Sequence, residues 1–171
     1  GNGSNLLVSD GGLDALVIYT GSLDGVSRTG GRTVRAGAGL SLARLASFAR
    51  REELGGLEFA HGIPGSLGGA VCMNAGAYGG EMKQVLTAVT AWFPDEGVRR
   101  LVPEGLDLSY RHSVFSDKRG VVLEAELLLE PRNGDEIASL MEDLSRRRRE
   151  KQPLEYPSAG STFKRPAPVD G

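Results

Sequence analysis

Small residues with free backbone N–H groups gather at Gly1-Asn2-Gly3-Ser4-Asn5, directly before a short apolar run. Successive N–H groups of this kind, together with two Asn side chains, can form a concave nest for an anion such as a pyrophosphate. The same residues also suit a tight hairpin turn, because Asn-Gly is the strongest short turn signal. Residues 1–5 therefore predict either an anion-binding nest or a turn.

Residues 55–80 form a second place of this kind and hold nine of the 25 glycines of the chain. Apolar side chains lie between these glycines, which distinguishes the stretch from a flexible linker. Glycine at this density indicates that the backbone comes close to another backbone or to a ligand. Within the stretch, Pro64 precedes Gly65-Ser66, which could begin a short helix whose N–H groups face a phosphate. A packing turn explains the same residues, so both interpretations stay open.

Four other groups have side chains with possible chemistry. Tyr110-Arg111-His112-Ser113 is a polar cluster, for which a surface ion pair and a structural histidine are the simplest explanations. Arg146 to Arg149 suit a solvated helix end that complements the helix dipole, and arginine also suits phosphate. Ser161 has no suitably placed histidine base, which argues against a hydrolase nucleophile. Cys72 lies between apolar neighbours and is expected to be a buried, inert thiol.

Composition excludes several classes of protein. The net charge of −2, from 22 acidic and 20 basic residues, argues against a general nucleic-acid-binding protein. One cysteine and two histidines indicate no internal disulfide, no metal site and a reducing compartment. No apolar run reaches the ~18–20 residues of a membrane span. The fingerprints of a Rossmann nest and of a P-loop are missing. Because the chain opens and closes abruptly, we expect a piece of a longer protein.

The elements that must position these residues follow from the hydrophobic pattern. Helical spacing predicts one helix after Ser41, stopping at Gly55-Gly56, a second from Gly134, and short helical turns near residues 65–71. In the last predicted strand, Val122 is expected on the same face as Glu124 and Glu126. Many short strands with two convincing helices indicate an α+β fold. The predicted strands are residues 6–8, 15–19, 32–36, 85–93, 98–102 and 121–129, with 21–31 as a hairpin loop.

Four runs, taken in order along the chain, resemble the UDP-N-acetylenolpyruvoylglucosamine reductases, the MurB family of bacterial cell-wall synthesis. They are GNGSNLLV (1–8), GLEFAHGIPGSLGGAVCMNAGAYGGE (56–81), YRHSVF (110–115) and KQPLEYPSAGSTFKRP (151–166). The short link after YRHSVF and the run KQPLEYPSAGS are similar to the type II branch, truncated at both ends. The glutamate that family members carry near the C-terminus has no counterpart here.

The resemblance implies a fold and a division into domains. The fold would be the α+β, FAD-binding fold of the vanillyl-alcohol-oxidase/PCMH type, incomplete, with the start of a substrate domain. Residues 1–13 would be the end of a first FAD-binding lobe and residues 14–150 a second lobe. Residues 151–171 would begin a C-terminal substrate-binding domain.

The resemblance also implies roles for individual residues. Arg111 would stabilise carbanion character next to a carboxylate, and Ser161 would donate a proton to the same intermediate. The residues implied in substrate binding are Asn74, Tyr78, Tyr110 and Lys151. The residues implied in FAD binding are Gly1, Asn2, Gly3, Ser4, Asn5, Leu6, Gly62, Ile63, Pro64, Gly65, Ser66, Gly69 and Val122.

The reaction implied by the resemblance has two halves. NADPH would reduce FAD, and the reduced flavin would convert UDP-N-acetylglucosamine enolpyruvate into UDP-N-acetylmuramate in the cytoplasm, for peptidoglycan synthesis. The partners would be this UDP-sugar and NADPH, with no nucleic acid and no membrane. Two alternatives remain: an FAD-dependent oxidase or dehydrogenase of the same fold, and a nucleotide-binding fragment without catalysis.

Overall fold

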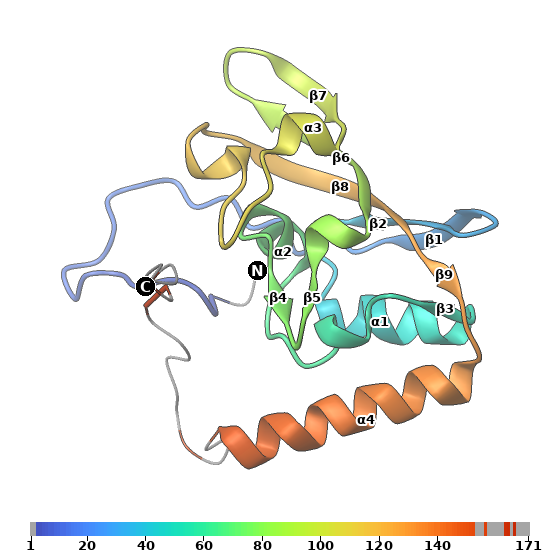
Figure 1. The fold of residues 1–171 in the computed structure, drawn as a ribbon. Helices are drawn as coiled ribbons and strands as arrows, with labels where there is room; N and C mark the ends of the chain where they lie inside the picture. The colour runs from blue at the N-terminus through green and yellow to red at the C-terminus, as the bar shows by residue number, and fades with distance from the viewer. Residues whose placement is uncertain (1–2, 153–155, 157–162, 165, 167–171) are drawn as a thin grey trace, which may run out of the picture.

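The computed structural model describes residues 3–152, 156, 163–164 and 166, and its centre is a five-stranded antiparallel sheet in the order β1-β2-β8-β6-β7 (Figure 1). The strands run over β1 Val26–Gly30, β2 Thr33–Gly37, β6 Leu86–Phe93, β7 Gly97–Leu101 and β8 Val121–Leu128. The β1–β2 and β6–β7 hairpins are each local in sequence. Only β8 joins them, because it pairs with β2 on one side and with β6 on the other.

Smaller elements surround this sheet. Two-residue strands pair as β3 Leu54–Gly55 with β9 Glu130–Pro131, and as β4 Gly76–Ala77 with β5 Gly80–Glu81. The helices are α1 Leu42–Arg51, α2 Leu67–Cys72, α3 Pro103–Leu106 and α4 Gly134–Lys151. Short 3-10 turns form η1 Glu58–Ala60, η2 Met82–Gln84 and η3 Val114–Ser116. The mixture of strands and helices confirms the predicted α+β class.

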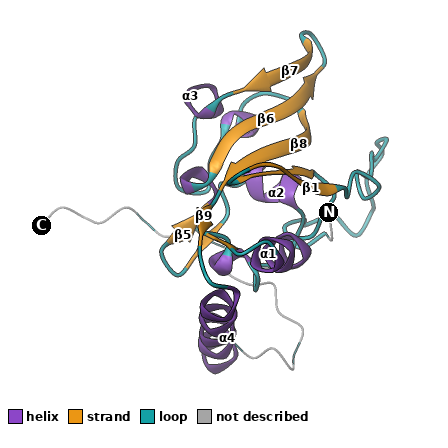
Figure 2. Ribbon diagram, turned by 90° about the vertical axis from the view of Figure 1, so that its right-hand side faces the viewer, coloured by secondary structure: helices purple, strands orange, loops and turns teal. Residues whose placement is uncertain are grey.

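Helices α2, α1 and α4 lie in succession below one face of the sheet, whereas α3 packs on β6 and β7 (Figure 2). Figure 2 shows α2 next to the strands, α1 beyond it and α4 outermost, and the contacts of α2 with β8, of α1 with α2 and of α4 with α1 agree with that order. The core fills the space between sheet and helices with fully buried side chains, such as Val34, Leu45, Leu67 and Leu127. No helix in the described part of the chain is long and apolar enough to cross a membrane. The proposed division at residues 13 and 150 stays a prediction.

Helix α1 forms where its sequence pattern predicts it. Ser41 is the N-cap, and its Oγ accepts a hydrogen bond from the N–H of Arg44 at 3.3 Å. The helix ends at Arg51, before the predicted stop at Gly55-Gly56, since Glu53 adopts the left-handed conformation with φ 56°. Its buried side chains are the four that helical spacing predicted, Leu42, Leu45, Ala46 and Ala49.

The predicted strands at residues 6–8 and 15–19 and the predicted loop at 21–31 are wrong. Residues 6–8 and 15–19 form no strand, and every residue from 3 to 19 is exposed, with Leu7 100% exposed. Strand propensity measures how a side chain fits a half-buried pleated surface, and these residues have no such surface against them. The segment predicted as a hairpin loop, residues 21–31, instead contains β1. Its polar side chains suit an edge strand, whose faces are largely solvated.

Strand β8 also corrects one detail of the prediction. Val122 is 4% exposed and is buried together with Ala125 and Leu127, not placed with Glu124 and Glu126. The pairing of β6 with β8 shifts register between Thr90 and Ala91, so that an extra residue of β8 is accommodated there. A bulge of this kind changes which side chains point to a given face. The alternation expected for a regular strand therefore breaks at residue 123.

The predicted C-terminal helix is present as α4. Asn133 caps its N-terminus, and its Oδ1 accepts hydrogen bonds from the N–H groups of Asp135 and Glu136. Only Ile137 and Met141 are fully buried along its length, which fits the outermost position of α4. The remaining strand predictions, 32–36, 85–93, 98–102 and 121–129, are confirmed to within one residue at each end as β2, β6, β7 and β8.

Candidate functional site

The two glycine-rich segments that the sequence singled out meet in the structure. The Ser4 hydroxyl donates a hydrogen bond to the carbonyl oxygen of Pro64 at 3.0 Å, across 60 residues of sequence. Gly65 has φ +141°, and a Cβ placed on it would lie 3.5 Å from Ser4 Oγ. Residues 3–6 form a turn closed by the Leu6 N–H and the Gly3 carbonyl, at 3.3 Å. Gly1 and Asn2 lie outside the described residues.

Around α2, some backbone N–H groups of the glycine-rich stretch bind within the protein, and others have no partner among the described residues. The N–H groups of Leu67 and Gly68 donate to the carbonyls of Leu40 and Ala38, both at 2.8 Å. A Cβ on Gly68 would lie only 2.9 Å from Ala38 Cβ, so this glycine is required by packing. The N–H groups of Gly65 and Gly69 have no partner among the residues that the structure describes. The donors left for a ligand therefore belong to loop 62–65 and to Gly69.

Arg111 is held in a fixed orientation by backbone oxygens. It lies at the tip of a tight hairpin in which Ser109 and His112 exchange two backbone hydrogen bonds of 3.2 Å, and it has φ 56°. Its Nη2 donates to the carbonyl of Gly76 at 2.9 Å, and Nη1 lies 3.4 Å from that of Asn74. Since a guanidinium has five N–H donors, this anchoring leaves others for an anionic ligand. The guanidinium is half-buried.

Asn74 connects the parts of the chain around Arg111. Its side chain is fully buried, and its Nδ2 donates to Glu81 Oε2 and to the Ser109 carbonyl, both at 3.0 Å. Its Oδ1 accepts from the N–H of Lys83 at 2.9 Å. Both amide N–H donors are thus occupied within the protein. In the structure Asn74 ties the Arg111 hairpin to β5 and η2, and it does not present its amide donors to a ligand.

Tyr78 lies on the hairpin formed by β4 and β5, and Tyr110 lies next to Arg111 on the hairpin closed by Ser109 and His112. Tyr78 and Gly79, with φ 53° and 83°, form the two-residue turn between β4 and β5, and Tyr78 is 45% exposed. Tyr110 is also exposed, and its ring centroid lies 5.1 Å from Cζ of Arg111. A Cβ on Gly80 would lie 2.5 Å from the Phe59 ring, which brings the hairpin flush against η1. Two tyrosine side chains and one guanidinium are therefore presented by two adjacent hairpins.

Electrostatic contacts fix the base of the site. Glu58 is 6% exposed, its Oε1 is 2.9 Å from Arg132 Nη1, and its Oε2 accepts from the Gly56 N–H at 2.8 Å.

Burial raises the pKa of the Cys72 thiol to about 11, so this cysteine is a neutral thiol near neutral pH. That agrees with the inert role predicted for it, although Cys72 is half-buried rather than buried. His112 Nε2 lies 3.1 Å from Asp107 and 3.5 Å from Asp117.

The remaining predicted residues are less central. Val122 is buried in β8, as described above, and Lys151 is the exposed last residue of α4. Ser161 lies outside the described residues. Arg148 lies beside the glycine-rich loop, which its sequence position did not predict: a Cβ on Gly62 would lie 3.5 Å from Arg148 Cδ. The only sequence signal for this contact was the run Arg146 to Arg149, and the sequence does not indicate which of these four arginines faces the loop.

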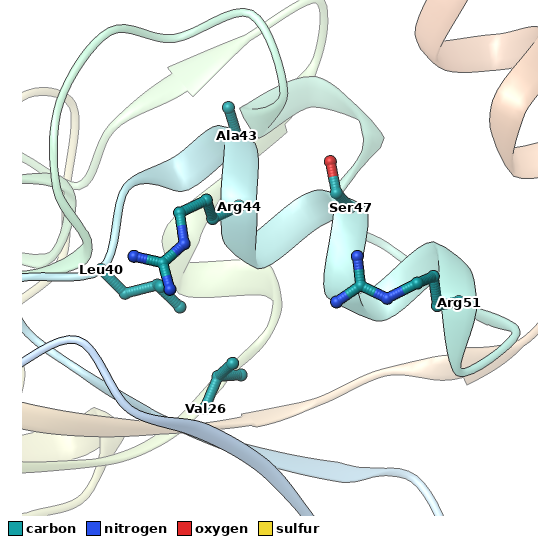
Figure 3. A pocket seen from close by; sticks show the side chains of 6 residues that line it. All are labelled: Val26, Leu40, Ala43, Arg44, Ser47 and Arg51. Atoms are coloured by element: carbon teal, nitrogen blue, oxygen red, sulfur yellow. The ribbon is translucent and has the colours of Figure 1, made fainter.

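A separate groove lies between α1 and β1, away from these residues. Figure 3 shows Arg44, Ser47 and Arg51 of α1 around it, with Val26 of β1 on the opposite side. Its volume is about 250 Å³. Arg44 is engaged in an ion pair with Asp24 at 2.7 Å. None of the predicted site residues lines this groove, so it is not part of the candidate site.

Comparison with known proteins gives concordant results. A family model described as FAD binding domain matches residues 1–101. UDP-N-acetylenolpyruvoylglucosamine reductases of Limosilactobacillus reuteri and Clostridium novyi are 52% and 51% identical to the chain over 166 residues, 97% of its length. The chain covers 55% and 54% of those two proteins, about half their length. The crystal structure of the enzyme (MurB) from Thermus caldophilus superposes with a TM-score of 0.85 at 41% identity, covering 97% of this chain and 60% of that one.

Proposed function

The chain belongs to the FAD binding domain family, and from this premise we propose that it is the flavin-binding part of a UDP-N-acetylenolpyruvoylglucosamine reductase. The expected resemblance to that enzyme family and the expected FAD-binding fold are both confirmed. The complete protein would use NADPH to reduce UDP-N-acetylglucosamine enolpyruvate in the cytoplasm, as a step of peptidoglycan synthesis. The observation that carries the proposal is the contact of the Ser4 turn with the Pro64 loop, beside backbone donors that have no partner among the described residues.

The described residues of this contact fit the diphosphate of FAD. A diphosphate needs several N–H donors and close backbone approach, which side chains would prevent. The N–H groups of Gly65 in the loop and of Gly69 in α2 have no partner in the described part of the chain, and the φ of +141° at Gly65 excludes most other residues there. We assign the phosphate contacts to Gly3–Leu6 and Gly62–Gly69. When bound, FAD supplies two-electron hydride chemistry, with NADPH as the source of the electrons.

Arg111 is proposed to bind the carboxylate of the substrate. Addition of hydride to the enolpyruvyl methylene carbon leaves negative charge on the neighbouring carbon and its carboxylate. A cation that is already oriented stabilises such charge most effectively, because no reorganisation is needed as the charge develops. The two carbonyl contacts of Arg111 provide that orientation. Ser161 is proposed to donate the proton that completes the reduction, as a positioned hydroxyl acid.

Exposed groups around Arg111 are proposed to hold the rest of the substrate. Tyr78 is exposed at the turn between β4 and β5, and the Tyr110 ring lies beside the Arg111 guanidinium, with its centroid 5.1 Å from Cζ. Lys151, at the end of α4, offers a mobile ammonium suited to a diphosphate. Asn74 is proposed to act on substrate binding indirectly, through the hairpin that carries Arg111.

The proposal is tested on the complete purified protein. FAD should be released on heat denaturation, and NADPH consumption should depend on UDP-N-acetylglucosamine enolpyruvate. A protein that neither contains nor takes up FAD would refute the flavin assignment. Oxidation of a small alcohol or hydroxy acid, with no response to the UDP-sugar, would instead support the oxidase alternative. Bound FAD without any turnover would support the non-catalytic alternative.

A further inference from the structure

The arginines near the end of α4 differ in what surrounds them. Arg146 contacts Asp143 at 2.5 Å and Glu150 at 2.8 Å, and Arg147 contacts Asp143 at 2.7 Å. Arg149 is exposed. Arg148 is half-buried, and its guanidinium has no ion pair or hydrogen bond with any residue that the structure describes. Arg148 is thus set apart from the other three.

The side chain of Arg148 lies against the glycine-rich loop. A Cβ on Gly62 would be 3.5 Å from its Cδ and 3.9 Å from its Nη1, and α4 packs against η1, which leads directly into this loop. Next to Gly62, His61 Nδ1 is buried and has no hydrogen-bond partner in the described part of the chain. A half-buried cation and an unsatisfied ring nitrogen therefore lie at the start of the loop whose other end contacts Ser4.

Neither stability nor helix capping explains this arrangement. The exposed Arg149 and Lys151 already place positive charge at the C-terminal end of α4, where the dipole favours it. Removing a charge partly from water without a partner is unfavourable, and proteins normally compensate with a counter-ion or hydrogen bonds. The group that would compensate Arg148 is an anion that enters with a ligand. Arginine matches phosphate because its fork of N–H donors can bind two phosphate oxygens.

We propose that Arg148 binds a phosphate of a nucleotide diphosphate lying at Gly62. This inference rests on the proposed function, which brings two such groups to the protein, the diphosphate of FAD and that of the UDP-sugar. Gly62 and the Arg148 stem lie close together, since a Cβ on Gly62 would be in van der Waals contact with Arg148 Cδ at 3.5 Å. Arg148 thereby becomes a residue that binds the nucleotide rather than part of a solvated helix face.

The test compares Arg148→Gln with Arg149→Gln in the complete protein. The two variants lose the same charge from neighbouring positions, but only Arg148 contacts the loop. Binding of FAD to the apoprotein is titrated by fluorescence, with riboflavin, which has no phosphate, as the second probe. The KM for the UDP-sugar is measured on the FAD-saturated enzyme. A loss of one charge-assisted contact corresponds to a change of about tenfold.

The outcomes separate the two sources of phosphate. If Arg148→Gln weakens FAD binding about tenfold and leaves riboflavin binding unchanged, the phosphate belongs to FAD. If FAD binding is unchanged and the KM rises about tenfold, the phosphate belongs to the UDP-sugar. Arg148→Lys should restore part of either effect. If Arg148→Gln differs from Arg149→Gln in neither measurement, the inference is wrong. If the unaltered protein does not bind FAD, the proposed function fails first, and with it the premise.

Discussion

Replacement of Asn74 by alanine should destabilise the protein and disturb Arg111 at the same time. The variant loses three hydrogen bonds, to Glu81, Ser109 and Lys83, from a side chain that is fully buried. A typical intramolecular hydrogen bond contributes about 1 kcal/mol to stability, which gives a loss of about 3 kcal/mol. Asn74 has φ 38°, and alanine tolerates that left-handed conformation less well, by about 1 kcal/mol. The expected decrease in the free energy of unfolding is therefore about 3–4 kcal/mol.

Urea denaturation followed by circular dichroism measures this decrease directly. For a domain of this size, it corresponds to a fall in Tm of roughly 6–16 °C. Asn74→Asp is the matched comparison, because it keeps the Oδ1 acceptor for Lys83 but loses the donors to Glu81 and Ser109. It also brings a second carboxylate against Glu81. A decrease below about 1 kcal/mol for Asn74→Ala would refute the reasoning, since it would mean that water replaces all three bonds at little cost.

Gly68 and Cys72 of α2 and the anchored Arg111 can each be tested by substitution. Gly68→Ala should lower the free energy of unfolding by about 1–3 kcal/mol in urea melts, because its Cβ would crowd Ala38 at 2.9 Å, and an unchanged midpoint would contradict that packing. Cys72 should react slowly with a thiol reagent at pH 7, because its pKa in the folded protein is about 11 against an ordinary 9.0. The stability that depends on the neutral thiol should be complete below pH 9 and lost as the pH rises toward 11. The free energies of unfolding of the unaltered protein and of Cys72→Ala, measured across that pH range, would check this. Arg111→Ala should slow reduction of the UDP-sugar by at least about 100-fold while leaving flavin reduction by NADPH nearly intact, as stopped-flow absorbance of the two half-reactions would show; equal losses in both would indicate a structural role.

The sequence predicted best what depends on local pattern. The N-cap at Ser41 and the four buried positions of α1 require only the helical period and one capping residue, and both are found. The strands at residues 6–8 and 15–19 failed because β propensity has effect only against a partner strand and a covering surface. The predicted orientation of Val122 is wrong because the bulge depends on the pairing of β8 with the neighbouring strand β6, and the periodicity of β8 alone does not indicate it.

The candidate site divides in the same way. Glycine density predicted a place of close approach, but only the fold distinguishes Gly68, which packs on Ala38, from Gly65, whose N–H has no partner in the part of the chain that the structure describes. Arg111 was found through its resemblance to a known motif, whereas its anchoring by the carbonyls of Asn74 and Gly76 comes from a hairpin far away in sequence. Arg148 was not separated from its three neighbours, because the pairing of Arg146 and Arg147 with acids on α4, and the position of Arg148 beside Gly62, are seen only in the structure.

The position of β8 bears on how the chain folds during synthesis. The β1–β2 and β6–β7 hairpins can each form soon after they leave the ribosome, but the strand that unites them comes later than both. Until residues 121–128 have emerged, β2 and β6 each present an unpaired edge, which is prone to incorrect pairing. We therefore expect a nascent chain that ends before β8 to hold two separate hairpins, and the single sheet to form once its middle strand has been translated.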